Sequence, residues 1–578
     1  MPEIIERCLG RGEGISFLDL PSSLHDTLLL SSPPPLRCNQ TSQEPVLSEK
    51  KQPTTAKPAP RKKAGSKSEP ALDFNPQFRS ALYAMEGSSA NILITGRAGT
   101  GKSTLLEHFR SVTEKQIAVL APTGVAAVNV AGQTIHSFFR FRPDTTPGKI
   151  REVKNPLYKN LDAIVIDEIS MVRADLLDLV DLFLRKNGPK KKKPFGGVQM
   201  IFIGDLYQLP PVLTRNDKEV LVQRYESEYF FDSDVFREVD FELIELEKVY
   251  RQTDDFFIGL LNGVRNKSIT DEQIGMINGR LAQREEQWPE GAIHLTTTNA
   301  MARERNERQL VRLKGKTYTF KAGLKGDFDQ KSAPADLELK LKRGARVMLL
   351  NNDPGGRWVN GSMGVLKDIE DEVLLVDMAS GNTEEVEPFT WSRFRFVWDE
   401  EAKAVTSEAI GKFTQYPVKL AWAVTIHKSQ GKTFDSVVVD IGRGTFAPGQ
   451  LYVALSRCRT LEGVYIRKPI KKAHIWLDWR VVRFITGYQY SRSDGELPLA
   501  DKIKLVKQAI ADSALLEMTY LKPNDTKSRR QIKPLCVEEM EYRGRSFTGL
   551  RAFCLERQAE RNFRVDRILD IALAQDGE

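Results

Sequence analysis

The chain has 578 residues, of which 41% are hydrophobic and 28% are charged, and this composition excludes a wholly disordered or collagen-like protein. At about 150 residues per domain the length predicts roughly four domains, and no apolar run approaches the roughly 18 residues of a membrane span. Lysine and arginine total 85 against 77 aspartate and glutamate, a net charge of +8 that fits nucleic-acid binding and a solvated basic surface equally well.

The residues before about position 70 are predicted to be disordered. The stretch from 31 to 70 is rich in Pro, Ser, Thr, Lys and Gln, so it offers too little apolar surface to offset the loss of chain entropy on folding. We find no targeting segment, and the five cysteines lie far apart without a C-x-x-C pair (Cys8, Cys38, Cys458, Cys536, Cys554). These features argue against a disulfide framework or a structural zinc site and predict a cytoplasmic protein.

The next region alternates strands with helices. Leu105, Leu106 and Phe109 recur at helical spacing. Short apolar runs predict buried strands at 91–95, 117–120, 163–166 and 200–203. Strands that alternate with helices favour a parallel α/β sheet.

The pattern then changes to short strands and turns. Between about 315 and 415 it predicts a small β-rich insertion. Apolar runs of the parallel type resume at 437–441 and 463–466, so the insertion interrupts a second α/β region.

A third change begins after about residue 485. The polar stretch 491–495 predicts a turn, and the stretch 503–510 has a helical pattern. Strand-like stretches follow at 516–520 and 530–537, so a separate C-terminal domain is expected.

A phosphate-binding loop follows the first predicted strand. Residues 96–103, Gly-Arg-Ala-Gly-Thr-Gly-Lys-Ser, match the pattern G-x-x-x-x-G-K-[ST] in full, with a strand before and a helix after. The glycines let backbone N–H groups approach phosphate at a helix N-terminus, where the helix dipole favours anions. We expect Lys102 to reach the β- and γ-phosphates and the Ser103 hydroxyl to bind Mg²⁺.

Further polar residues supply the other groups that nucleotide hydrolysis needs. Asp167 ends a predicted strand and is expected to hold Mg²⁺ through water, while Glu168 is expected to activate the attacking water. Gln208 follows the next strand and can sense the γ-phosphate or its water. Arg251 and Arg457 can supply the positive charge that a dissociative transition state requires.

Taken in order, these motifs resemble a superfamily-1B helicase of the PIF-like (petite integration frequency) family, of bacterial type and related to RecD. The resemblance spans about residues 75–470 and implies two RecA-like domains with ATP in the cleft between them. The blocks that carry it are 121–127, 132–139, 167–171, 193–199, 204–212, 360–364, 425–433 and 452–457.

The resemblance also implies roles for individual residues. The catalytic set would be Lys102, Asp167, Glu168, Gln208, Arg251 and Arg457. ATP would contact Gln77, Gly96, Gly99, Thr100, Gly101, Lys102, Ser103, Thr104, Gly431 and Lys432, and Mg²⁺ would be held by Ser103 and Asp167. Single-stranded DNA would contact Thr123, Gly124, His136, Phe138, Asn299, His427, Lys428 and Ser429. These contacts would be mainly to phosphate and sugar, with Phe138 or its neighbours as a stacking face, although His136 and His427 could instead be packing histidines.

By the same resemblance the chain divides into five parts. They are a disordered tail (1–70), a first RecA-like domain (71–248), a second RecA-like domain (249–480), a linker (481–500) and a C-terminal domain (501–578). A short wedge that separates the DNA strands would lie near 140–154, and the insertion at 315–415 would be SH3-like.

The C-terminal part resembles a WYL domain, a small SH3-like β-barrel found in bacterial regulators and some helicases. The run Arg-Asn-Phe-Arg-Val-Asp-Arg-Ile at 561–568 carries the resemblance, whereas the naming tripeptide is replaced by Thr-Gly-Leu at 548–550. An anion-binding pocket for nucleotide or single-stranded DNA could be formed by Arg551, Arg561, Arg564 and Arg567. In a purely structural barrel these arginines would instead pair with Glu556, Glu560 and Asp566.

The leading interpretation is an ATP-dependent DNA helicase that moves on single-stranded DNA and unwinds duplex or forked DNA. The resemblance alone implies 5′-to-3′ movement and work in replication, repair, recombination, telomere-type or G-quadruplex processing. One alternative is an AAA-type or RecA-type NTPase without unwinding activity, which shares the phosphate loop but does not require the block 425–433. Another is a WYL-type ligand-sensing regulator with an inactive NTPase core, against which the complete nucleotide motifs argue.

Overall fold

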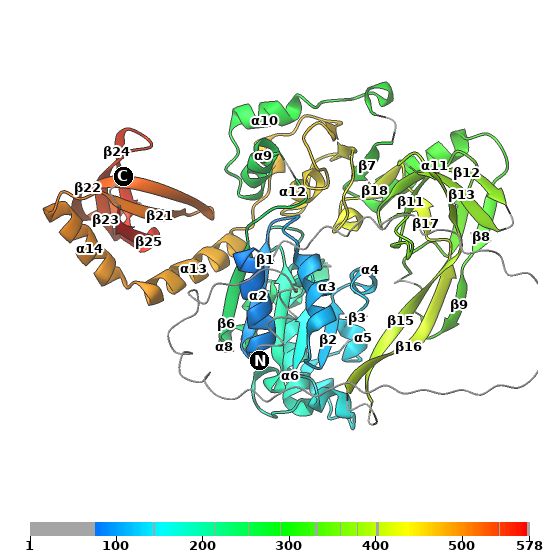
Figure 1. Ribbon diagram of the computed structural model, residues 1–578, viewed down its shortest axis with the longest axis horizontal. Helices are drawn as coiled ribbons and strands as arrows, with labels where there is room; N and C mark the ends of the chain where they lie inside the picture. The colour runs from blue at the N-terminus through cyan, green and yellow to red at the C-terminus, as the bar shows by residue number, and fades with distance from the viewer. Residues whose placement is uncertain are drawn as a thin grey trace, which may run out of the picture.

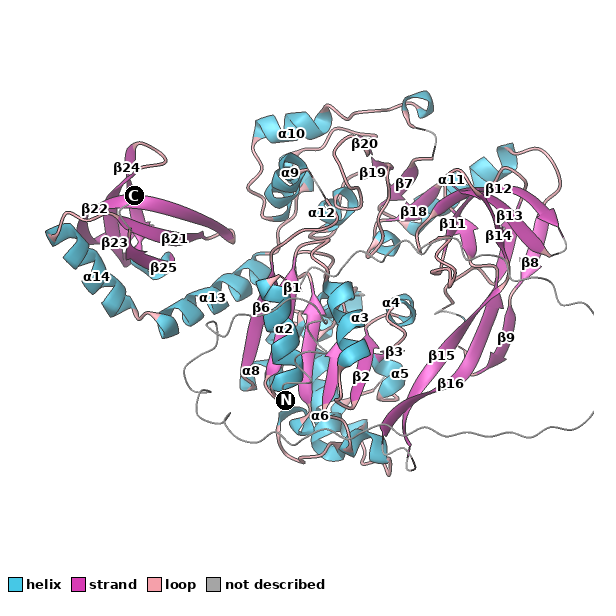
Figure 2. Cartoon of the chain, viewed as in Figure 1, coloured by secondary structure: helices cyan, strands magenta, loops and turns pink. Residues whose placement is uncertain are grey.

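The computed structural model describes residues 75–574, except 143–144, 214, 253, 290, 329, 331–332, 359, 371, 379, 400, 402–403 and 543. The predicted N-terminal tail lies outside the described residues. Two α/β domains lie next to each other, the second carries a β-rich insertion, and a small C-terminal domain is joined to them by one long helix (Figure 1 and Figure 2). None of the described helices is both long and apolar enough to cross a membrane.

The first domain is built on a six-stranded parallel sheet in the order β3-β2-β4-β5-β1-β6. Its strands are β1 (Asn91–Gly96), β2 (Ile117–Ala121), β3 (Gln133–Thr134), β4 (Ala163–Ile166), β5 (Gln199–Gly204) and β6 (Phe241–Leu246). Its helices are α2 (Pro76–Gly87), α3 (Lys102–Val112), α4 (Gly124–Asn129), α5 (Ile135–Phe138), α6 (Ala174–Asn187), α7 (Arg215–Leu221) and α8 (Asp234–Glu238). The four strands predicted in this region are confirmed.

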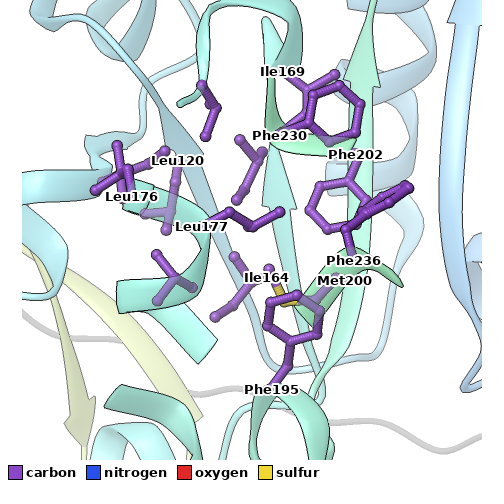
Figure 3. Close-up of a cluster of buried hydrophobic side chains, with 14 of the residues drawn as sticks. Leu120, Ile164, Ile169, Leu176, Leu177, Phe195, Met200, Phe202, Phe230 and Phe236 are labelled. Carbon is purple, nitrogen blue, oxygen red and sulfur yellow. The ribbon is translucent and has the colours of Figure 1, made fainter. Parts of the chain in front are cut away.

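An apolar core lies on each face of this sheet. Ile164 and Ile166 of β4 join the cluster that contains α6, whereas Ala163 and Val165 join the cluster formed with α2 and α3. Figure 3 shows part of the first cluster, in which Ile164 lies near Leu177 of α6. Because both faces of the strand are covered, β4 is apolar at every position, as is typical of a buried parallel strand.

The second domain has a smaller parallel sheet in the order β18-β7-β19-β20. Its strands are β7 (Ile293–Thr296), β18 (Ala423–Thr425), β19 (Val437–Asp440) and β20 (Val464–Ile466). Its helices are α9 (Asp255–Arg265), α10 (Asp271–Asn278), α11 (Asn299–Arg312) and α12 (Gln450–Leu455). The expected α/β fold with two tandem domains is therefore confirmed.

The insertion contains antiparallel strands, as the sequence predicts. They are β8 (Tyr318–Lys321), β9 (Gly323–Gly326), β10 (Glu338–Leu341), β11 (Arg346–Leu349), β12 (Met363–Glu370), β13 (Val373–Met378), β14 (Thr383–Val386), β15 (Phe389–Asp399), β16 (Ala404–Gln415) and β17 (Val418–Leu420). Five of them form the sheet β14-β13-β12-β11-β17. The long β15–β16 hairpin extends towards the first domain (Figure 1), where Arg393 Nη2 donates a hydrogen bond of 3.0 Å to Ser137 Oγ.

The C-terminal domain follows a helix that corrects one prediction. The stretch 491–495 is not a turn, because α13 (Trp479–Glu496) continues through it. Phe484 of α13 stacks on Phe231 of the first domain with ring centroids 4.4 Å apart, and Ser493 Oγ donates to the carbonyl oxygen of Leu569 at 2.6 Å. These tertiary contacts stabilise a helix whose polar, glycine-containing end has low helical propensity by itself.

After α13 come α14 (Leu499–Ala511) and a five-stranded antiparallel sheet in the order β24-β23-β22-β21-β25. The strands are β21 (Leu516–Lys522), β22 (Thr526–Tyr542), β23 (Arg545–Cys554), β24 (Ala559–Arg564) and β25 (Ile568–Leu573). The predicted helix and strands of this domain are confirmed. Its core is separate from those of the other domains and includes Val506, Ile532 and Leu550.

Candidate active site and DNA-contacting loops

The phosphate-binding loop joins β1 to α3. Gly101 precedes α3 with a φ of 85°, a left-handed conformation that favours glycine. Lys102 Nζ donates to the carbonyl oxygens of Gly96 and Arg97 at 2.7 and 2.9 Å, so the lysine holds the loop closed. A Cβ atom at Gly99 would lie 2.5 Å from Cβ of Arg251, which explains why this position needs glycine. Ser103 and Thr104 lie in the first turn of α3, while the Thr100 hydroxyl donates to Arg97 O at 3.0 Å.

Two adjacent carboxylates follow β4. Burial raises the pKa of Asp167, and burial together with the charge of Asp167 raises the pKa of Glu168 to about 7. Glu168 has a φ of 51°, an unusual conformation for a residue with a side chain. A carboxyl group that titrates near neutral pH is suited to general-base catalysis.

Gln208 lies in the loop after β5 and is nearly buried. Its amide Nε2 donates to Asp205 Oδ2 at 3.1 Å, and the hydroxyl of Tyr452 donates to the same oxygen at 3.2 Å. The hydroxyl of Tyr452 also accepts a hydrogen bond of 2.9 Å from the backbone N–H of Ala98 in the phosphate loop. Asp205 and Tyr452 thus connect the phosphate loop, Gln208 and the second domain.

The two predicted arginines meet at the junction of the α/β domains. Arg457 is 1% exposed, and its guanidinium donates to the carbonyl oxygens of Val453, Ser429 and Lys432 at 2.8, 3.3 and 3.2 Å. Burial and the nearby charge of Arg251 lower the pKa of Arg457 to about 9. Two cations close together in a buried place favour binding of an anion between them.

Gln77, one of the residues predicted to contact ATP, has a neighbour that sequence reasoning missed. Gln77 lies in the first turn of α2, and Asn75, the N-cap residue of this helix, donates from Nδ2 to the hydroxyl of Tyr250 at 2.8 Å. Tyr250 is 39% exposed and lies beside the phosphate loop, in which the carbonyl oxygen of Gly99 accepts a hydrogen bond of 2.8 Å from the Tyr250 N–H. An exposed aromatic ring beside the phosphate loop offers a stacking surface for a base.

Gly431 and Lys432 lie across the cleft from the phosphate loop. Gly431 O accepts a hydrogen bond from Arg251 Nη2 at 3.5 Å. Lys432 Nζ donates to Asn360 Oδ1 of the insertion rather than to a group of the first domain. The adjacent Gln430, which the sequence did not single out, donates from Nε2 to Glu168 Oε2 at 3.0 Å.

Three of the residues predicted to contact DNA line a cavity of about 460 Å³ in the second domain, or lie next to it. Asn299 at the start of α11 and Lys428 line this cavity, and His427 precedes Lys428. Lys419 also lines it, and burial with the charges of Lys432 and Lys428 lowers the pKa of Lys419 to about 7. The lining also includes Arg303, Glu307 and Asp336, so the cavity offers cations that suit phosphate groups together with carboxylates that oppose them. Ser429, by contrast, is fully buried and donates from Oγ to Ile426 O at 2.7 Å.

The first domain presents the other predicted contacts, with one correction. Thr123 caps α4 by accepting from Ala126 N at 3.2 Å, Gly124 begins that helix, and His136 is exposed on α5. Phe138 is only 3% exposed and packs edge-on against Phe139 with ring centroids 4.8 Å apart. Phe138 therefore belongs to the core and cannot stack on a base, because its ring faces the interior.

The four arginines of the C-terminal domain do not form one pocket. In the register of β23 and β24, Arg551 lies opposite Asn562 and Arg561 lies opposite Ala552. The side chains of Arg551 and Arg561 are therefore on opposite faces of the sheet. Arg551 Nη2 lies 2.7 Å from Glu538 Oε1, and Arg564 Nη2 lies 2.5 Å from Asp566 Oδ2. Arg567 lies in the short turn between β24 and β25.

Three family models match successive parts of the chain. Residues 78–273 match the PIF1-like helicase family, residues 420–465 match the UvrD-like helicase C-terminal domain, and residues 501–573 match the WYL domain. The first match covers the first α/β domain and extends through α9 into α10 of the second, the next falls on the second α/β domain, and the last falls on the C-terminal domain.

Similar proteins agree with the family models. The ATP-dependent DNA helicase Pif1 of Bdellovibrio bacteriovorus is 31% identical over 408 residues, which is 68% of this chain and 88% of the relative. The human ATP-dependent DNA helicase PIF1 is 34% identical over 70% of this chain, and the match spans 62% of the human protein.

Solved structures give the same result. Pif1 from a Bacteroides species in complex with ADP-AlF4 is 37% identical with a TM-score of 0.67, covering 73% of this chain and 98% of that one. The structure of Bacteroides Pif1 bound to single-stranded DNA has a TM-score of 0.55 at 37% identity, with the same coverage. The chain belongs to the PIF1-like family of ATP-dependent DNA helicases.

Proposed function

We propose that ATP is hydrolysed in the cleft between the two α/β domains. Lys102 contacts the β- and γ-phosphates, Glu168 activates the attacking water, and Gln208 senses the γ-phosphate. Arg251 and Arg457 stabilise the charge that develops on the transferred phosphoryl group. The observation that carries this proposal is the convergence of Lys102 and Arg457 on Glu168, whose pKa burial and the charge of Asp167 raise to about 7 against the effect of these cations.

The residues present also fit a magnesium ion. Asp167 is a half-buried carboxylate at the end of β4, and Ser103 lies in the first turn of α3 beside the phosphate loop. Among the described residues no group of three His, Cys, Asp or Glu side chains could hold a metal. Mg²⁺ takes one or two protein ligands and completes its shell with phosphate oxygens and water, so Asp167 and Ser103 would be enough to hold it. The ion would neutralise phosphate charge during hydrolysis.

The DNA substrate we propose is a single strand that crosses both α/β domains. His136 and Thr123 contribute from the first domain, and Asn299, His427 and Lys428 contribute from the second. Movement is 5′-to-3′, a polarity that rests on the family resemblance, and duplex or forked DNA is unwound ahead of the motor. The bacterial relatives named as ATP-dependent DNA helicases support the helicase activity, whereas a role in genome maintenance in the bacterial cytoplasm rests on the family resemblance.

The C-terminal domain adds a second, smaller anionic contact in this proposal. Arg551 and Arg564 share one face of the β23–β24 pair and would meet a nucleotide or a single-stranded segment there. Each already has an acidic partner, so the ligand would compete with Glu538 and Asp566.

The decisive experiment compares Lys102→Ala with wild type and with Lys507→Ala, an exposed lysine on α14. DNA-stimulated ATP hydrolysis should be lost in Lys102→Ala and retained in the control, with unchanged circular dichroism. Undiminished turnover in Lys102→Ala would refute the assignment. Unwinding of 5′-tailed and 3′-tailed duplexes by the wild type then tests activity and polarity together.

A further inference from the structure

The tip of the β21–β22 hairpin carries a carboxylate that is buried against both α/β domains. Asp525 is only 8% exposed, although it lies in a tight turn of the C-terminal domain. Its Oδ2 accepts a hydrogen bond of 2.8 Å from the hydroxyl of Tyr207 in the first domain. Its carbonyl oxygen accepts a hydrogen bond of 3.0 Å from Nδ2 of Asn266 in the second domain. Asp525 therefore contacts both α/β domains.

A buried arginine, Arg265, lies between this carboxylate and Asp205 of the loop that carries Gln208. The guanidinium of Arg265 lies over the ring of Tyr207, 3.8 Å from its centroid. Arg265 Nη1 is 3.8 Å from Asp525 Oδ2, and Arg265 Nε is 3.9 Å from Asp205 Oδ1. A buried cation is costly without nearby negative charge. One of the two carboxylates that balance Arg265 thus belongs to the C-terminal domain.

The other carboxylate is the one that positions Gln208. Asp205 Oδ2 accepts from Gln208 Nε2 and from the hydroxyl of Tyr452, which is bonded in turn to the phosphate loop. The loop that carries Asp205, Tyr207 and Gln208 also packs closely against the second domain, because a Cβ atom at Gly449 would lie 2.4 Å from Tyr207 O. A shift of Tyr207 or Arg265 would therefore be transmitted to Asp205 and Gln208.

A second contact fixes the hairpin against the first domain. Lys527 Nζ lies 3.0 Å from Glu245 Oε2 and 3.4 Å from Glu247 Oε1, at the end of β6. Gln489 of α13 donates from Nε2 to Asp525 Oδ1 at 3.5 Å. Figure 1 shows β21 directed from the C-terminal sheet towards the junction of the α/β domains.

We propose that Asp525 is a positioning residue for ATP hydrolysis, supplied by the C-terminal domain. The docked hairpin holds Tyr207 and Arg265, and through Asp205 it sets Gln208 for the transition state. The inference rests on the proposed role of Gln208 in the nucleotide site.

The experiment uses the full-length protein with Asp525→Ala, Asp525→Asn and Tyr207→Phe, and with Asp512→Ala as the control. Asp512 is an exposed carboxylate that caps the end of α14 in the same domain. We expect Asp525→Ala to lower the DNA-stimulated kcat about tenfold while KM for ATP changes less than about twofold, because only the transition state is affected. Asp525→Asn keeps an acceptor for Tyr207 but not the charge, so its kcat should lie between those of Asp525→Ala and the wild type.

A binding measurement separates positioning from loss of the nucleotide site. Affinity for ADP should stay within about twofold in Asp525→Ala, whereas affinity for ADP with aluminium fluoride should fall about tenfold, because the latter mimics the transition state. The effects of Tyr207→Phe and Asp525→Ala should be strongly non-additive, since both remove one hydrogen bond.

The outcomes distinguish a failure of the inference about Asp525 from a failure of the proposed nucleotide site. Wild-type kcat in the Asp525 variants and in Tyr207→Phe would overturn the inference, even if Lys102→Ala is inactive. Additive effects of Tyr207→Phe and Asp525→Ala would also overturn it. Persistent turnover in Lys102→Ala would instead overturn the assignment of the nucleotide site. If Asp525→Ala fails to fold, Tyr207→Phe still tests the contact, because it removes the same hydrogen bond from the motor side.

Discussion

Gln430 of the second domain donates a hydrogen bond of 3.0 Å from Nε2 to Oε2 of Glu168 in the first domain. The bond crosses the cleft and reaches the carboxylate proposed as the general base. It also lowers the pKa of Glu168, although burial and the charge of Asp167 outweigh it and raise that pKa to about 7. Closure of the two domains is thereby connected to the ionisation state of the base.

The pH dependence of hydrolysis follows from this contact. Glu168 must be deprotonated to accept a proton, so kcat/KM should fall as the pH drops below about 7 in the wild type. Gln430→Ala removes an interaction that favours the carboxylate, and the acid limb should therefore move to higher pH. A pH profile of kcat/KM checks this, with the exposed Gln223→Ala as control. A limb that stays in place would disprove the link between Gln430 and Glu168.

Arg457 should matter for the chemical step more than for binding of ATP. Arg457→Ala is expected to lower kcat by about 10³, the lower end of the range for an arginine finger. Arg457→Lys should restore little, because an ammonium cannot reproduce the forked hydrogen bonds of the guanidinium. The matched control is Arg459→Ala, whose side chain is 66% exposed beside Asp435. Steady-state kinetics measure kcat, and an equal loss of kcat in Arg457→Ala and Arg459→Ala would contradict the assignment.

The elements that sequence reasoning identified are those determined by local pattern. The strand 163–166 is apolar throughout because each face of the sheet has its own core, and such a run needs no tertiary knowledge to be recognised. The phosphate loop is likewise determined locally, since glycines, lysine and hydroxyl stand at fixed spacing. The blocks around Asp205 and Tyr452 were recognised as motifs, but the hydrogen bonds of Tyr452 to Asp205 and Ala98 depend on how the domains meet.

What the sequence could not predict depends on contacts between distant residues. The helix across 491–495 is stabilised by Phe231 and Leu569, which lie in other domains. Phe138 lies in a block that resembles DNA-contacting loops, yet its ring packs among aromatic residues of the core. An aspartate in a turn such as Asp525 usually faces solvent, and no local pattern reveals that it docks beside Tyr207.

The contrast between Phe138 and His136 tests the corrected assignment. Phe138→Ala should lower the free energy of unfolding by about 3–5 kcal/mol, because it removes a buried aromatic ring and leaves a cavity. His136→Ala should leave unfolding within about 0.5 kcal/mol, because the side chain is exposed, and should weaken single-strand binding instead. Chemical denaturation and fluorescence anisotropy with a labelled oligonucleotide separate the two effects. Wild-type stability in Phe138→Ala would contradict burial of this ring.

Binding of single-stranded DNA should depend steeply on salt, because the proposed contacts are mainly to phosphate. A plot of the logarithm of affinity against the logarithm of salt concentration has a slope of about −0.7 for each phosphate neutralised on a single strand. Lys428 is exposed beside the cavity that Asn299 lines, so Lys428→Ala should make the slope shallower by about 0.7. Lys218→Ala, an exposed lysine on α7, serves as the control and should leave the slope unchanged. Titrations at four or more salt concentrations give the slopes, and a Lys428→Ala slope equal to wild type would remove this lysine from the DNA path.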